Sequence, residues 1–335
     1  MKSTEQVLPE PPEPIGPTGS IAPGGTRASS VFMGRQDYTS ITLRLIVMEL
    51  YKLRRRVMSK VLVICMIVAT IGLYLLILIA VSLISRNSAQ PEFITNFTSP
   101  LRLPQSLYLA VQLLLSLGQI LIIILVSTVV GGEYSAGTIR LMLTRGPTRT
   151  QIFWSKVGMA FACIVGVVIG VAVLGVASGL LFNLATGIPA TFDFLSAGWL
   201  GHAFLYLLAT MLGLFMPAML ALFLSTLGRA TAAGLAGALT WSFFIEPVIQ
   251  VLSPFGRAIP GPIGDFFVSL PNYLIGPNIS TLLNDQYQFL AFGPQSATQT
   301  PVVMFDLPAL AVLAVYLVLF IGVAWWVSLR RDITN

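Results

Sequence analysis

Residues that could carry out chemistry are few in this chain, and they lie far apart. The longest polar-rich stretch in its apolar central part is GGEYSAGTIRLMLTRGPTRTQIFWSK, from Gly131 to Lys156. Gly132 and Gly137 have the spacing of a phosphate-binding loop, and Thr138 follows closely. However, the lysine of the G-x-x-x-x-G-K-[ST] pattern is absent and no strand precedes the stretch. We therefore do not expect this segment to bind nucleotide phosphates.

Enzymatic chemistry has little support elsewhere in the sequence. The chain has one histidine, His202, and it shows neither a paired carboxylate motif nor residues at metal-ligand spacing. Cys65 and Cys163 fall inside apolar runs, so we interpret them as small buried apolar residues rather than as a disulfide or a metal site. We expect no catalytic residue, no metal and no cofactor in this chain.

The composition indicates that most of the chain has lipid as its solvent. Of the 335 residues, 56% are hydrophobic and 10% are charged, and the mean hydropathy is +0.85. Soluble domains have roughly 25% charged residues. No soluble fold of this length could bury so much apolar surface away from water. We attribute the net charge of +6 to basic residues in the cytoplasmic loops, and not to nucleic-acid binding.

Six apolar runs have the length of about 20 residues that a spanning helix needs. They cover residues 61–85, 107–130, 157–185, 199–226, 231–252 and 307–328. The fourth and fifth runs are separated by only LGRA, which predicts a tight helical hairpin. Residues 253–306 contain seven prolines, so we expect short helices dipping into the outer leaflet there instead of a seventh span. The fold class expected is an all-α membrane protein.

The distribution of Lys and Arg predicts the orientation in the membrane. With the N-terminus inside, the cytoplasmic segments hold sixteen Lys and Arg residues and the outer segments hold three. This bias predicts that both termini are cytoplasmic. The stretch that begins at Gly131 then lies in a cytoplasmic loop.

The segment before the first span divides into two parts. Residues 1–37 are polar and rich in Pro and Gly, which predicts a disordered cytoplasmic tail. The sequence that follows, ITLRLIVMELYKLRRRVMSK, predicts an amphipathic helix in the inner membrane interface, with cations facing anionic headgroups. The cations proposed for this role are Arg44, Lys52, Arg55 and Arg56. A basic flanking segment that only anchors the chain is the alternative.

The stretch from Glu133 to Lys156 resembles the loop between the second and third spans of ABC-2 type permeases. These proteins are six-span membrane subunits of ATP-binding-cassette transporters. The family pattern has an acidic residue, then Gly-Thr, an apolar and basic helix, a Pro or Ser with Arg, and a Lys that opens the third span. The interfacial helix, the broken segment before the last span and the ending SLRRDITN agree with it. The resemblance covers residues 38–335, as one transmembrane domain.

The resemblance implies that this loop contains a coupling helix, which docks on a separate ATPase subunit. The residues that match the pattern are Glu133, Gly137, Thr138, Ile139, Arg140, Leu141, Met142, Leu143, Arg145 and Arg149. Ile139 to Leu143 form a short apolar segment with basic neighbours, and Gly146-Pro147 ends it. A basic loop that merely obeys the positive-inside rule is the alternative.

The implied function is that of a transport subunit and not of an enzyme. ATP and Mg would bind the partner ATPase, because the cytoplasmic pieces of this chain are too short for a nucleotide-binding domain. A second copy of the permease, or a homologous one, would complete the complex in the plasma membrane, expected to be a bacterial inner membrane. A non-transporting membrane anchor or assembly subunit is the main alternative. A secondary transporter is a third, although no inverted repeat is visible.

Two ionisable residues within the spans are candidates for the translocation path. Glu246, followed by Pro247, lies in the outer half of the fifth span, where a charge is costly and usually faces a cavity or a partner. His202 begins the fourth span at a similar height. A polar gate or substrate contact formed by Glu246, with His202 near it, is one interpretation. The alternative is a protonated Glu246 that hydrogen-bonds a neighbouring helix, or a Glu246 close enough to the headgroups to be wet.

Small residues recur at helical spacing in the third and fifth spans. Gly166 and Gly170, and likewise Gly234 and Ala238, are four residues apart. This pattern is typical of helices that pack closely. It predicts either a sliding interface or ordinary tight packing.

Overall fold

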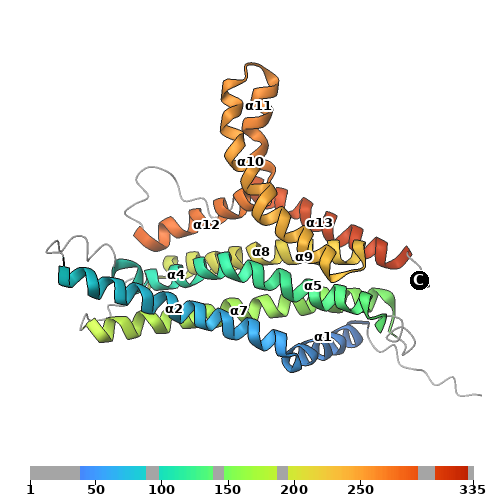
Figure 1. Cartoon of the computed structure of the whole chain (residues 1–335), viewed down its shortest axis with the longest axis horizontal. Helices are drawn as coiled ribbons and strands as arrows, with labels where there is room; N and C mark the ends of the chain where they lie inside the picture. Colours follow the sequence, from blue (N-terminus) through green and yellow to red (C-terminus); the bar gives the residue numbers. More distant parts are fainter. Residues whose placement is uncertain (1–37, 88–97, 139–146, 187–194, 293–305, 331–335) are drawn as a thin grey trace, which may run out of the picture.

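The computed structural model describes residues 38–87, 98–138, 147–186, 195–292 and 306–330 (Figure 1). The described residues form helices and short connections, with no strand among them. Six helical stretches are long and apolar enough to cross a membrane: Val57–Leu83, Gln105–Ser135, Arg149–Ala185, Ala197–Gly228, Thr231–Ala258 and Leu307–Arg330. The prediction of an all-helical chain with six candidate membrane spans is therefore confirmed.

The first three spans run along the bundle with one interruption. Helix α1 (Tyr38–Arg55) leads into α2 (Val57–Asn87), which is the first span. The second span consists of α4 (Gln105–Leu113), a π-helical turn η2 (Leu114–Gly118) and α5 (Gln119–Ser135), preceded by the short η1 (Ser99–Leu101). The third span, α7 (Arg149–Thr186), begins eight residues before its predicted start at residue 157.

Helix α8 (Ala197–Gly228) forms the centre of the bundle. It packs against α5, α7, α9, α12 and α13. Of its most apolar window, 56% is buried, against 17% for α2. Met216, Met219 and Leu222 on α8 are almost completely buried. The core therefore lies around α8, and α2 lies at its margin.

The fifth span turns away from the bundle. It consists of α9 (Thr231–Thr240), a π-helical turn η3 (Trp241–Ile245) and α10 (Glu246–Leu252). The predicted tight hairpin before it is present, with Arg229 in the left-handed conformation at φ 52°. Helix α9 packs against α5 and α8, whereas α10 and α11 project away from the other helices (Figure 1).

Short helices follow α10, the first of them still within the span that ends at Ala258, and none of them forms a further span. They are η4 (Ser253–Ala258), α11 (Pro262–Ser269), η5 (Leu270–Tyr273) and α12 (Ile275–Phe292). Prolines in their first turns fit these helix starts, because proline lacks the N–H that a first turn leaves unpaired. Helix α12 returns to pack against α8 and α13 (Leu307–Arg330), so it joins the bundle.

Candidate functional site

The end of the bundle where α5 ends and α7 begins holds a buried ion pair, and we call this region the loop end. Lys156 donates from Nζ to Oε2 of Glu133, and both side chains are 5% exposed. The pair joins two helices across the loop that separates them. Removing a carboxylate and an ammonium from water is costly unless each neutralises the other. The pair therefore requires that α5 and α7 keep this relative position.

Helix α1 is connected to the same pair. Nζ of Lys52 lies 2.9 Å from Oε1 of Glu49, one turn earlier on α1, and 3.9 Å from Oε1 of Glu133. Glu49 is buried as well. Two carboxylates and two ammonium groups thus form a neutral set, which we call the loop-end network. It ties three helices together at one point.

Two local features shape the helix ends around this network. Thr148 and Gln151 form a capping box at the start of α7: Oγ1 of Thr148 accepts from the Gln151 N–H, and Oε1 of Gln151 accepts from the Thr148 N–H. Gly137 takes φ +65° just after α5, a conformation that favours glycine. These two features end α5 and begin α7 on either side of the loop.

The loop end also packs closely on the turn between α8 and α9. A Cβ atom on Gly131 would lie 2.5 Å from the backbone nitrogen of Thr231. Only glycine fits that approach, so the last turns of α5 abut the hairpin directly. On the other side, Nη1 of Arg149 donates to the carbonyl oxygen of Leu329, 3.1 Å away, at the end of α13. The start of α7 is therefore held against α13.

The predicted docking residues fall into two groups. Glu133, Gly137, Thr138 and Arg149 are described, and they lie at the two ends of the loop. The other predicted residues lie outside the described residues: Ile139, Arg140, Leu141, Met142, Leu143 and Arg145. The structure brings Glu133 together with Lys156 and Lys52, and it places Arg149 apart from them, against α13.

The cations predicted on the interfacial helix do not share one environment. Arg44, Arg55 and Arg56 are exposed, whereas Lys52 is partly buried because it takes part in the loop-end network. Arg55 lies over the ring of Tyr51, 4.6 Å from its centroid. Glu49, on the same helix, is buried.

Glu246 lies in a different setting, in the half of the fifth span that is farther from the hairpin. Its carboxylate accepts three N–H groups: Nε1 of Trp241 at 2.9 Å, the Ile275 backbone at 3.1 Å and the Gly276 backbone at 2.9 Å. Ile275 and Gly276 begin α12, and the first N–H groups of a helix have no partner within it. Glu246 therefore caps α12 from another helix.

His202 and Glu246 contact different parts of α12. Nδ1 of His202 lies 2.6 Å from Oε1 of Gln286, on α12. Gln286 is ten residues beyond Gly276, which corresponds to roughly 15 Å along the helix. The structure thus separates the two residues, and each of them holds a different part of α12.

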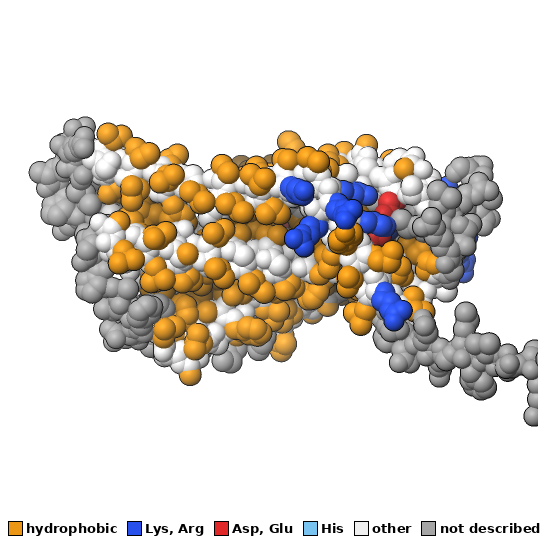
Figure 2. All heavy atoms as spheres, turned by 90° about the horizontal axis from the view of Figure 1, so that it is seen from below, with side chains coloured by type: hydrophobic (Ala, Val, Ile, Leu, Met, Phe, Trp, Pro, Cys, Tyr) orange, Lys and Arg blue, Asp and Glu red, His pale blue; other side chains and the backbone are white. Residues whose placement is uncertain are grey.

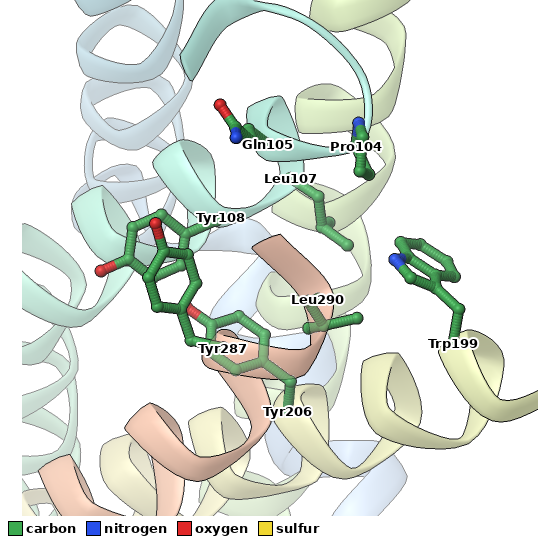
Figure 3. Close-up of a pocket in the computed structure, with 8 residues that line it drawn as sticks. All are labelled: Pro104, Gln105, Leu107, Tyr108, Trp199, Tyr206, Tyr287 and Leu290. Atoms are coloured by element: carbon green, nitrogen blue, oxygen red, sulfur yellow. The ribbon is translucent and has the colours of Figure 1, made fainter. Parts of the chain in front are cut away.

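An aromatic cluster holds α12 near the His202 contact (Figure 3). The ring of Tyr287 stacks on Tyr108 of α4 with centroids 3.7 Å apart, and Tyr206 of α8 lies 6.0 Å from Tyr108. A cavity of about 10 Å³ adjoins these rings, with Trp199 and Leu290 on its wall. Stacked and tilted aromatic pairs of this kind stabilise packing. They join the second span, the fourth span and α12.

A larger cavity of about 190 Å³ adjoins Glu246. Its polar wall includes Gln112, Gln119 and Ser242, and its apolar wall comes from α8 and α12. The π-helical turns η2 and η3 both lie at this cavity, and such turns occur frequently at functional sites. The arrangement places hydrogen-bond donors and acceptors beside the apolar side chains of α8 and α12.

The chain was compared with models of known protein families. A family model described as "Protein of unknown function (DUF2705)" matches residues 73–334. The chain belongs to this family. The matched region contains Glu133, Lys156, His202 and Glu246, while α1 and the start of α2 precede it. No curated protein matches the chain.

Sequence reasoning missed several long-range partners of the predicted residues. Lys52 pairs across 81 residues with Glu133, and Gln286 pairs across 84 residues with His202. No local signal indicates either contact. The capping box did have a signal, because Thr148 followed by Gln151 matches the S/T-x-x-E/Q pattern. Recognising it would have placed the start of α7 at Arg149.

Proposed function

We propose that this chain is the permease subunit of an ABC transporter. In this proposal it exports a substrate across the plasma membrane, using ATP hydrolysed by a separate ATPase subunit that docks on the loop of residues 132–150. The six candidate spans and the resemblance of Glu133 to Lys156 to ABC-2 permeases support it. A second permease copy or a homologous one completes the complex, and both termini face the cytoplasm of a bacterial cell.

The observation that carries the proposal is the loop-end network. Both helices that flank the loop are joined by the buried Glu133–Lys156 pair, and α1 is joined to them through Lys52. A force applied to the loop would therefore move α5, α7 and α1 as one body. A rigid-body shift of packed helices is a common form of switching transition. A loop that served only to place positive charge would not need this buried pair.

The cavity beside Glu246 is the part of the fold that best suits a substrate path. Its position between η2, η3, α8 and α12 puts it at both π-helical turns. Glu246 itself is engaged with three N–H donors, so its first role in this proposal is to fix α12 at the cavity wall. His202 fixes the same helix further along.

Copurification tests the proposal against the alternative of a non-transporting anchor. Native purification of the full chain is expected to bring down a soluble ATPase with a Walker motif. Repeated purification without any nucleotide-binding partner would favour the anchor.

An aspartate scan of Leu141, Met142 and Leu143 tests the docking surface. A carboxylate buried without a partner at an interface costs several kcal/mol, whereas a loop in water accepts it at almost no cost. We expect at least one of the three variants, for example Met142→Asp, to lose the ATPase subunit and the coupled ATP hydrolysis. Thr148→Asp is the control, because aspartate also caps a helix. Unchanged partner retention in all three variants would refute docking at this segment.

Cysteine labelling tests the orientation. Cysteines placed at Gln90 and Gln295 are expected to react with an impermeant reagent added outside intact cells, and a cysteine at Thr148 is not. Labelling at Thr148 from outside would invert the proposed topology.

A further inference from the structure

An apolar crevice opens between α2, the second span and α7, apart from the sites described above. Its volume is about 370 Å³. Val63 and Ile67 of α2 form one wall, Leu125 of α5 forms another, and Gly166 and Gly170 of α7 form its floor. Its lining is almost entirely apolar, so water would be a poor occupant.

The two glycines keep the crevice open. A Cβ atom on Gly166 or on Gly170 would meet nothing within 4 Å. Further along the same helix, a Cβ on Gly175 would lie 2.8 Å from Ala110, and one on Gly179 would lie 2.2 Å from Ser106. Small residues of α7 thus serve close packing at one end and leave open space at the other. Gly234 of α9 is also a close-packing glycine, because a Cβ atom there would collide with Ser225.

The length of the crevice matches one leaflet. On α7 it extends from Cys163 to Leu174, and on the second span from Leu114 to Leu125. Each distance is eleven residues, or about 16 Å of helix. Half of the hydrocarbon core of a bilayer is about 15 Å. A single acyl chain running along α7 would therefore fit within one leaflet.

Cationic residues lie next to the part of α2 that begins the crevice wall. Ser59, in the first turn of α2, lines it, and Arg56 and Lys60 flank this turn. Lys60, Val63 and Ile67 follow one another at spacings of three and four residues, which places them along one side of α2. Arg54, Arg56 and Lys60 are exposed and form no ion pair with the described residues. Figure 2 shows Lys and Arg side chains gathered beside an extended apolar surface.

We propose that this crevice binds one anionic phospholipid. Its acyl chain lies against Gly166 and Gly170, and its phosphate lies between Arg56 and Lys60. The charge decides the occupant: unpaired cations at the edge of an apolar groove one leaflet long complement a lipid with a negative headgroup. The apolar helix of a second copy would leave these cations without a counterion. The inference is independent of the proposed transport function.

The test fills the crevice without disturbing the packing. Gly166→Leu combined with Gly170→Leu places side chains in open space, and Gly322→Leu on α13, whose Cβ also meets nothing within 4 Å, is the matched control. The full chain is purified in mild detergent, and bound phosphatidylglycerol and phosphatidylcholine are counted by native mass spectrometry. We expect the double variant to lose bound phosphatidylglycerol at least tenfold and the control to retain it.

A second pair of variants tests the headgroup separately. Arg56→Gln with Lys60→Gln removes two exposed charges, so folding should not suffer. At about 1 kcal/mol for each cation near a membrane surface, the preference for phosphatidylglycerol over phosphatidylcholine should fall about thirtyfold. Arg257→Gln, which removes an exposed charge on η4, should leave the preference unchanged.

Three outcomes would overturn the proposal. The first is unchanged lipid binding in the filled crevice. The second is equal binding of the two lipids by the unaltered chain. The third is that the filled variant loses self-association but no lipid, which would make the crevice a contact between copies.

Discussion

Glu133 and Glu246 are both buried within the helical bundle, at 4% and 5% exposure, but they meet different partners. Glu133 faces the ammonium groups of Lys156 and Lys52. Among the described residues, Glu246 hydrogen-bonds to N–H donors from Trp241 and from the start of α12. The first arrangement balances one full charge with another. The second relies on the partial positive charge at a helix N-terminus.

This difference predicts how each region responds to a lost carboxylate. At the loop end, the loss leaves a buried ammonium group without a carboxylate to neutralise it. At the start of α12, the loss leaves unpaired N–H groups, which carry no net charge. A buried unpaired charge is the more costly of the two.

The largest effect is expected for Glu133→Gln. Lys156 would keep its charge in a buried position without a carboxylate, because Glu49 contacts only Lys52 among the described residues. Breaking one side of such a pair costs about 3–5 kcal/mol of unfolding free energy. A denaturant titration in mild detergent measures the change.

A double variant distinguishes the charge from the packing at this position. Glu133→Gln combined with Lys156→Met removes both members of the pair and should recover most of the lost stability. If the double variant is as unstable as Glu133→Gln alone, an unpaired Lys156 charge is not the cause.

A smaller effect is expected for Glu246→Gln. Oε1 of the amide retains the bonds from Trp241 and Ile275, while its NH₂ group faces the Gly276 N–H and cannot accept from it. One unsatisfied buried donor costs about 1–3 kcal/mol. The same titration measures the loss, and hydrogen exchange at Gly276 locates it. Trp241→Phe, which removes one donor and keeps the carboxylate, is the matched control.

The order of these two losses is the critical result. If Glu246→Gln destabilises the protein more than Glu133→Gln does, the distinction between an ion pair and a helix cap is wrong. It would then follow that Glu246 has a charged partner outside the described residues.

The same contrast explains what could be predicted from the sequence. The six spans follow from runs of about 20 apolar residues, and such runs are recognisable without tertiary contacts. The start of α7 was placed eight residues late because the apolar run begins only after Lys156. The helix itself already begins at Arg149. The π-helical turn η3 in the fifth span was not predicted, because such a turn has no simple sequence signal.

The site was predicted less completely than the fold. Glu133 and Lys156 were recognised as parts of one motif, but not as partners, because 23 residues separate them. Glu246 was recognised as costly at its position, and hydrogen bonding to a neighbouring helix was one of the alternatives for it. Its partners Ile275 and Gly276 lie about 30 residues further along, and only the fold brings them to it.

The smallest effect is expected for Thr148→Ala, which compares a cap within one helix with the cap that Glu246 provides between helices. Thr148 and Gln151 satisfy each other's N–H groups at the start of α7. Loss of such a capping residue costs about 1 kcal/mol. Because the contacts are local, hydrogen exchange should rise at Gln151 and Ile152 and remain unchanged at the distant Ile275. Thr148→Ser, which keeps the hydroxyl, should behave like the unaltered chain.

Glu246→Gln, in contrast, should raise exchange at the start of α12, which is on a different helix from the substitution. Faster exchange throughout α5 after Thr148→Ala would mean that the cap also supports the loop-end network, and the two kinds of cap would then not differ in reach.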